Sequence, residues 1–178
     1  MLLGFYGHGP LTGVTTWARE FPETIKLLTR HMRLDDPQFK FTSIQVNNNY
    51  VAQAHTDRDN HGDSFIVAPG SYTGGQLWAQ HLDGTELHAI TPDESKHLGG
   101  LSRPGHLVPG ISVDIHESFH MFDGTLLHMA KEFTGDRVSM VWLTPKNYVH
   151  VATDDCDFLQ HLGFNLPLLD HCLGMTIS

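Results

Sequence analysis

Three short stretches of the chain place an aspartate two residues after a histidine: His55-Thr56-Asp57, His61-Gly62-Asp63 and His81-Leu82-Asp83. Residues i and i+2 of a β-strand point to the same side, so such a pair can offer an imidazole and a carboxylate to one ion. Two imidazoles and one carboxylate on one face of Fe(II) leave positions open for a cosubstrate and O2. The pattern alone carries little weight, because 14 histidines in 178 residues produce such pairs by chance.

The surrounding sequence distinguishes the three pairs. His55 and Asp57 end a strand-like run that starts near Phe39. In the second pair Gly62 indicates a loop, and the third pair runs into the turn signal Asp83-Gly84. We therefore predict that His55 and Asp57 are two ligands of a metal ion.

The third ligand is expected from a distant strand. His128 lies in a short predicted strand and is the preferred candidate, with His116 and His120 as alternatives. Arg137 and Ser139 follow, and their i, i+2 spacing places them on one face of the next predicted strand. A guanidinium and a hydroxyl are suited to hold the far carboxylate of a dicarboxylic acid, although a surface salt bridge would also explain the arginine.

In this order, the His-x-Asp pair, the distal histidine and the Arg-x-Ser pair resemble the Fe(II)/2-oxoglutarate dioxygenase superfamily from Val46 through Leu143. Gly74-Gly75-Gln76-Leu77 is similar to a Gly-Gly-Glu-Leu segment of that superfamily. The motif His55-x-Asp57-x-x-Asn60 looks most like the branch that contains the TET and J-base oxygenases.

The resemblance implies a site of defined composition. His55, Asp57 and His128 would bind Fe(II), while Arg137 and Ser139 would hold the cosubstrate 2-oxoglutarate, which reacts with O2 to give succinate and CO2. Asn60 would face the substrate, although an asparagine beside a glycine also suits a turn. One member of the polar run 47–49 (Asn47, Asn48, Asn49) could reach the 1-carboxylate of the cosubstrate, and the sequence does not choose among them.

The substrate is left open among three classes. The first is a 5-methylpyrimidine nucleobase, which the Asn60 motif favours and which an enzyme must flip into its pocket. The second is a protein side chain or a small molecule. The third possibility is a non-catalytic jelly-roll binding module, against which the complete ligand set argues. The net charge of −9 does not support a broad nucleic-acid surface, so binding of nucleic acid would need a local patch.

The predicted elements that position these residues are mainly β-strands with flanking helices. At 178 residues the chain fits one domain, and its opening residues lack the pattern of a signal peptide, so we expect a soluble intracellular protein that does not cross a membrane. We predict that the first third of the chain is helical, with helices over about 15–35 and Pro22 at a helix start. We also predict a helix over 155–163 and a double-stranded β-helix (jelly-roll) core over 41–144. Residues 69–75 and 134–136 are expected to be turns, and 91–110 a loop.

Overall fold

The structure is a computed structural model that describes residues 1–99 and 102–169. Strands make up 36% of it and helices 23%, and the strands form two antiparallel sheets, which confirms the mainly β class. Neither sheet closes into a barrel within the described residues, so the jelly-roll topology stays a prediction.

The chain divides into two compact units. The first comprises Met1–Val46, Asp59–Ser64 and the chain from Met140 onward, and the second comprises Asn47–Arg58 and Phe65–Ser139.

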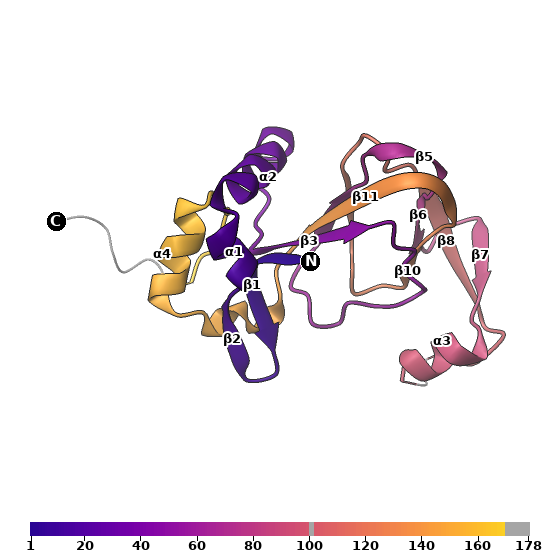
Figure 1. Cartoon of the computed structure of the whole chain (residues 1–178). Helices are drawn as coiled ribbons and strands as arrows, with labels where there is room; N and C mark the ends of the chain where they lie inside the picture. Colours follow the sequence, from indigo (N-terminus) through magenta and orange to yellow (C-terminus); the bar gives the residue numbers. More distant parts are fainter. Residues whose placement is uncertain (100–101, 170–178) are drawn as a thin grey trace. The chain divides into compact units, whose positions relative to one another are not determined.

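The first unit groups helices with a β-hairpin (Figure 1). It contains β1 (Leu2–His8), β2 (Leu11–Val14), α1 (Thr16–Glu20), α2 (Pro22–Asp35), the 3-10 helix η1 (Lys146–His150) and α4 (Thr153–His161). α1 and α2 lie within the predicted segment 15–35, and α4 overlaps the predicted segment 155–163, whereas η1 was not predicted. Pro22 occupies the first position of α2 as expected. The apolar face of α2 buries Ile25 and Met32.

The hairpin of β1 and β2 corrects the expectation that the first third of the chain is helical. Leu3 and Phe5 alternate into the core, and Gly4 lies between them with φ +92°. A Cβ at Gly4 would lie 2.5 Å from both the Phe164 ring and the carbonyl oxygen of Thr42. This close approach joins residues far apart in the sequence, and no local pattern in the first residues indicates it.

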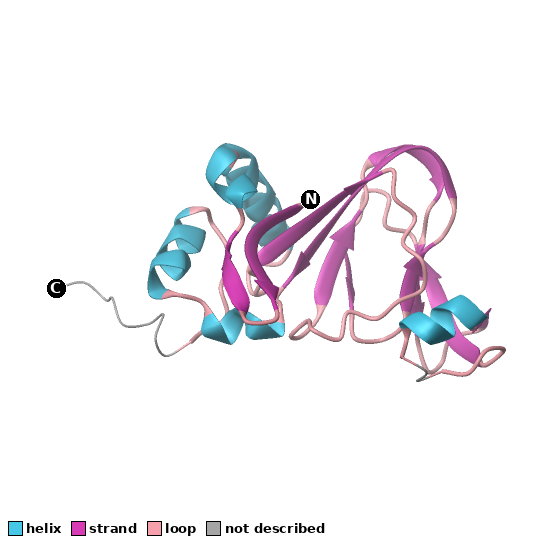
Figure 2. Ribbon diagram, turned by 60° about the horizontal axis from the view of Figure 1, so that its bottom comes forward, coloured by secondary structure: helices cyan, strands magenta, loops and turns pink. Residues whose placement is uncertain are grey.

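Strands and loops form most of the second unit (Figure 2), whose elements are β5 (Gly70–Gly74), β6 (Leu77–Gln80), β7 (Glu86–Ala89), α3 (Pro92–His97), β8 (Leu107–Val113), β9 (His120–Phe122) and β10 (His128–Ala130). Three further strands have residues in both units: β3 (Ser43–Asn48), β4 (Ser64–Val67) and β11 (Phe133–Leu143). The sheet in the order β10-β6-β8-β7 lies wholly within the second unit. One of its faces packs around the buried side chains of Trp78, Val108 and Leu127.

Two predicted turns are strands. Residues 70–74 form β5, and 134–136 lie inside β11, which pairs antiparallel with β5. The prediction of turns was based on glycine. Gly70, Gly74 and Gly135 do have positive φ, but they lie within the closely paired strands β5 and β11 and do not reverse the chain. A Cβ at Gly135 would lie 2.3 Å from the carbonyl oxygen of Ser71. Glycine in a strand can mark such a close backbone approach.

The predicted loop 91–110 contains α3 and the first residues of β8. Thr91 and Glu94 form a capping box at the start of α3, with Pro92 in the first turn, so the helix has a local signal that the loop prediction overlooked. His88 of β7 lies 3.1 Å from a carboxylate oxygen of Glu94, which ties α3 to the sheet.

Among the described residues, the helices are all too short or too polar to cross a membrane.

Candidate metal centre and anion site

His55 and His128 are brought together by backbone pairing. The amide of His55 donates to the carbonyl of His128 and the amide of His128 donates to that of His55, both at 3.0 Å. Ala130 continues the pairing by donating to Ala52 at 3.0 Å. Directly opposed residues of an antiparallel pair have their side chains on one face. The two imidazole centroids therefore lie 4.3 Å apart, although 73 positions separate the residues in the sequence.

One nitrogen of each imidazole is committed to a backbone carbonyl. Nδ1 of His55 lies 2.7 Å from the carbonyl oxygen of Gln53, and Nδ1 of His128 lies 2.9 Å from that of Leu126. A carbonyl oxygen only accepts, so in the neutral imidazole each Nδ1 carries the proton and each Nε2 keeps a lone pair. Histidines that bind metals are commonly oriented in this way.

Asp57 completes the group. Its amide donates to the carbonyl of Gly124 at 2.8 Å, and its two carboxylate oxygens lie 3.7 Å from Nε2 of His55 and 3.7 Å from Nε2 of His128. One donor atom from each of the three residues lies within 4.8 Å of the others. Ligands about 2.1 Å from a shared ion are separated by no more than about 4.2 Å, so small side-chain adjustments would let all three bind one ion.

The site is buried on one side and open on the other. The His128 side chain is 7% exposed and has the Phe122 ring 5.0 Å away, whereas the side chains of His55 and Asp57 are 41% and 35% exposed. Burial, with the His55 imidazole beside it, lowers the pKa of His128. A lowered pKa favours the neutral imidazole, which is the form that binds metal.

The competing histidine pairs do not form such a group within the described residues. His61, Asp63, His81 and Asp83 are all exposed, and Nδ1 of His81 accepts from the amide of Asp83 in a turn. Of the alternatives to His128, His116 has its Nε2 2.7 Å from the carbonyl oxygen of Gly70. His120 lies in β9 outside the group, and burial lowers its pKa.

Arg137 and Ser139 lie on one face of β11 and are both buried, at 2% and 5% exposure. The Arg137 guanidinium reaches the carbonyl of Tyr50 at a long 3.4 Å, and its Nε has no hydrogen-bond partner among the described residues. None of the ion pairs in this part of the chain includes Arg137. The surface salt bridge considered from the sequence is therefore not formed. A buried cation without a carboxylate is costly, so this arrangement is suited to an exogenous anion.

Sequence reasoning missed the aromatic walls of this anion site. The guanidinium carbon lies 5.2 Å from the Phe133 ring centre and 5.7 Å from that of Tyr72. Burial raises the pKa of Tyr72, with Arg137 acting in the opposite direction. Phe133 shares the strand face of Arg137 at i−4, a signal that the predicted turn at 134–136 concealed. Gly75 leaves room for the arginine, since a Cβ there would lie 3.3 Å from its Cδ.

The asparagine run divides into three different roles. Asn49 has φ 49° and accepts from the amide of Arg137 at 2.7 Å, so it holds the backbone of β11 in place. Asn48 is exposed. Asn47 is half-buried, and its Nδ2 lies 3.5 Å from Oγ of Ser139, which makes it the member directed toward the anion site.

Asn60 belongs to the first unit, whereas the other predicted site residues belong to the second. It is 8% exposed, and its backbone forms an isolated bridge with Pro145. The neighbouring amide of His61 donates to the carbonyl of Thr144 at 2.7 Å. The segment is thus held by backbone bonds, and the proposed contact of Asn60 with substrate stays a prediction.

Comparison of the chain with protein-family models and with curated proteins found no match. The chemistry must therefore be inferred from the site. His55, Asp57 and His128 could hold a metal ion. Arg137, separately, offers a positive charge enclosed by aromatic rings.

Proposed function

We propose that the chain is an Fe(II)- and 2-oxoglutarate-dependent dioxygenase with a jelly-roll core, which hydroxylates an organic substrate and releases succinate and CO2. The observation that carries the proposal is the convergence of two Nε2 atoms and one carboxylate in a group exposed on one side. Bound iron with 2-oxoglutarate would supply the activation of O2. Two histidines with one carboxylate and open positions are the ligand set of non-haem Fe(II) oxygenases.

The residues of the chain fit the metal because backbone hydrogen bonds favour the tautomer that leaves Nε2 of each neutral imidazole as a ligand. The backbone carbonyls of Gln53 and Leu126 orient the two imidazoles, and no proton has to leave Nε2 for an ion to bind. Asp57 supplies the negative charge. The exposed sides of His55 and Asp57 leave room for ligands that the protein does not provide.

Arg137 supports 2-oxoglutarate as the cosubstrate. A carboxylate can pair with the guanidinium in a bidentate manner and would satisfy the unpartnered Nε or the terminal nitrogens. Ser139 can add a hydroxyl hydrogen bond, and Asn47 can hold that hydroxyl in position. The walls of Tyr72 and Phe133 exclude water and strengthen the charge interaction.

The experiment that tests the metal centre is a titration of the purified chain with Co(II), a redox-stable substitute for Fe(II), under anaerobic conditions. We expect about one ion per chain, loss of binding in His55→Ala and His128→Ala, and normal binding in His81→Ala, a matched substitution in an exposed turn. Full binding in His55→Ala with loss in His81→Ala would show that the ligand assignment is wrong.

Catalysis is tested separately by succinate formation from 2-oxoglutarate with Fe(II), O2 and candidate substrates. A methylated oligonucleotide tests the 5-methylpyrimidine class that the Asn60 motif favours, and peptides and small molecules test the alternative class. Substrate-dependent succinate would support an enzyme. Metal binding without any succinate, coupled or uncoupled, would favour the non-catalytic binding module instead.

A further inference from the structure

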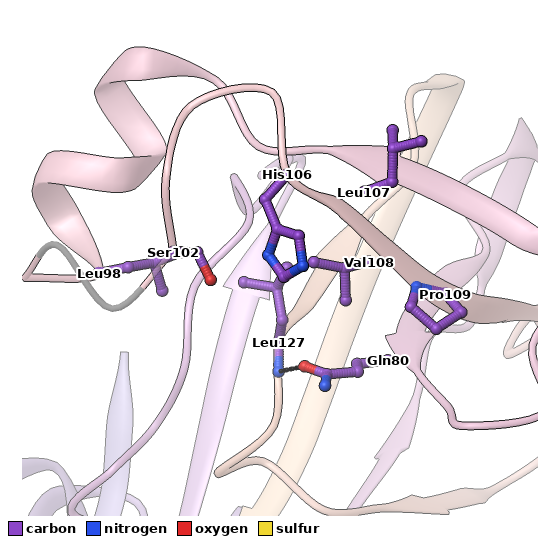
Figure 3. A pocket seen from close by; sticks show the side chains of 8 residues that line it. All are labelled: Gln80, Leu98, Ser102, His106, Leu107, Val108, Pro109 and Leu127. Carbon is purple, nitrogen blue, oxygen red and sulfur yellow. Dashed lines mark hydrogen bonds between the residues drawn. The ribbon is translucent and has the colours of Figure 1, made fainter.

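The four-stranded sheet of the second unit bears a small cavity of about 160 Å³ (Figure 3). Its lining includes the buried apolar side chains of Leu98, Val108 and Leu127. Gln80, Ser102 and His106 add polar groups; His106 is exposed, and Ser102 is half-buried. The cavity therefore combines an apolar interior with a few neutral or weakly basic hydrogen-bonding groups near the solvent.

The cavity is distinct from the metal centre. Leu127 and His128 are consecutive residues of an extended segment, so their side chains point to opposite faces of the sheet. Leu127 packs with Trp78 and Val108, whereas the His128 ring lies beside those of His55 and Phe122. A molecule in the cavity would approach the segment that carries His128 from behind.

Gln80 links the cavity to that segment through two contacts with Leu127. The backbone amide of Gln80 donates to the carbonyl of Leu127 at 2.8 Å, and the amide of Leu127 donates to the side-chain Oε1 of Gln80 at 3.3 Å, the dashed contact in Figure 3. The side chain of Gln80 lines the cavity. A ligand that hydrogen-bonds to Gln80 would thus act on the residue that precedes the metal ligand His128.

We propose that this cavity is a regulatory site for a small, uncharged, mainly apolar molecule with one hydrogen-bonding group, and that its occupation changes the affinity of the triad for metal. The size follows from the volume, because an apolar cavity of about 150 Å³ admits a benzene-sized molecule. The chemistry follows from the lining, in which the described residues include no carboxylate, lysine or arginine. The second half of the proposal depends on the metal centre described above, and the first half does not.

Phenol is a suitable probe, because it has a six-membered ring and one hydroxyl group. We expect saturable binding to the whole chain with a Kd on the order of 1 mM, measured by calorimetry, as for a ligand of few heavy atoms. Ser102→Phe places a ring in the lining and should weaken phenol binding at least about 10-fold. Ser118→Phe makes the same change at an exposed serine outside the cavity and should leave phenol binding unchanged.

Coupling is measured by titrating Co(II) with and without saturating phenol. We expect the Kd for Co(II) to change at least about 5-fold, and Co(II) should change the Kd for phenol by the same factor, because such linkage is reciprocal. Gln80→Met keeps a side chain of similar length but removes the side-chain hydrogen bond with the Leu127 amide, while the backbone hydrogen bond to the Leu127 carbonyl stays. At phenol concentrations that saturate the variant, it should lose the coupling.

The outcomes separate the parts of the proposal. Absence of saturable phenol binding, or equal binding by Ser102→Phe, would overturn the cavity site whether or not the chain binds metal. Phenol binding with an unchanged Kd for Co(II) would overturn the coupling alone. If the chain bound phenol but no Co(II), the metal centre and the coupling that depends on it would be wrong, while the cavity site would stand.

Discussion

Replacement of Arg137 by methionine should change two measurable quantities in opposite directions. Methionine is apolar and of similar volume, so it removes a guanidinium that has no carboxylate partner among the described residues and whose Nε makes no hydrogen bond. The free chain should then be as stable as the parent or more stable. At the same time the proposed partner of 2-oxoglutarate is lost.

The magnitudes follow from the burial of the side chain, which is 2% exposed. Loss of one partner of a buried charge pair costs about 2–5 kcal/mol, so the Kd for 2-oxoglutarate should rise about 30- to 5,000-fold. Replacement of a buried charged group by an apolar one of similar volume is neutral or stabilises by about 1–4 kcal/mol. Ser139→Ala removes only one hydrogen bond, from a neutral hydroxyl to the charged carboxylate, and should cost about 1.5–3 kcal/mol in binding.

The binding assay is calorimetry with 2-oxoglutarate and Co(II) under anaerobic conditions, and the stability assay is denaturant unfolding of the free chain. Arg103→Met is the matched control, because Arg103 is exposed. The reasoning would be refuted by an Arg137→Met chain that binds 2-oxoglutarate normally and unfolds several kcal/mol more easily than the parent. That result would make Arg137 a structural residue.

Three further predictions concern other parts of the chain. Asn60→Ala should keep metal and 2-oxoglutarate binding and slow substrate oxidation about 5- to 150-fold. This factor corresponds to the cost of about 1–3 kcal/mol for a buried substrate group that loses its hydrogen bond to Asn60. Loss of metal binding or an unchanged oxidation rate would contradict the proposed substrate role. Gly75→Val should weaken 2-oxoglutarate binding and lower the free energy of unfolding by at least about 1–3 kcal/mol, because φ at Gly75 is +72° and a Cβ would lie 2.9 Å from the Tyr72 ring. Calorimetry and denaturant unfolding test this prediction. The control is Gly62→Val, because Gly62 has a similar φ but open space around its Cα. Burial raises the pKa of Tyr148 to about 12 from an ordinary value of 10.0, so the fold favours the neutral phenol. The stability from this group is present below pH 10 and should be lost between pH 10 and 12. Tyr148→Phe should remove one late-ionising tyrosine from an ultraviolet titration, and a titration unchanged by the substitution would contradict the prediction.

Local sequence was sufficient for elements whose signals are local. The helix that starts at Pro22 has its proline at the first position and its apolar residues at helical spacing, and the structure places α2 there. Arg137 and Ser139 could be proposed as a shared-face pair, because the alternation of a strand is a property of the backbone itself and both lie in β11. The strand-like run expected to end at His55 and Asp57 was wrong, because β3 ends at Asn48 and His55 forms only an isolated bridge with His128. The capping box of α3, formed by Thr91 and Glu94, is also a local signal, so the helix could have been predicted where a loop was expected.

Other features depend on contacts between distant segments, which no local pattern contains. Gly70, Gly74 and Gly135 suggest turns in the sequence, yet they lie in the paired strands β5 and β11. Glycine is needed there because the two strands approach so closely that a Cβ would collide with the opposite backbone. Gly4 in β1 is explained in the same way by the Phe164 ring. The sequence signals that glycine is needed at such positions, but only the partner segment shows why.

The candidate site shows the same division. Residue types and spacing indicated which side chains could bind a metal ion and an anion, because the chemistry of imidazole, carboxylate and guanidinium does not depend on the fold. The sequence preferred His128 but kept His116 and His120 as alternatives, and the tertiary structure brings only His128 of the three beside His55, by backbone pairing. It also shows which nitrogen of each imidazole faces a backbone carbonyl. The burial of Arg137 without a carboxylate partner is likewise a property of the folded chain, since desolvation arises only when distant segments enclose the charge.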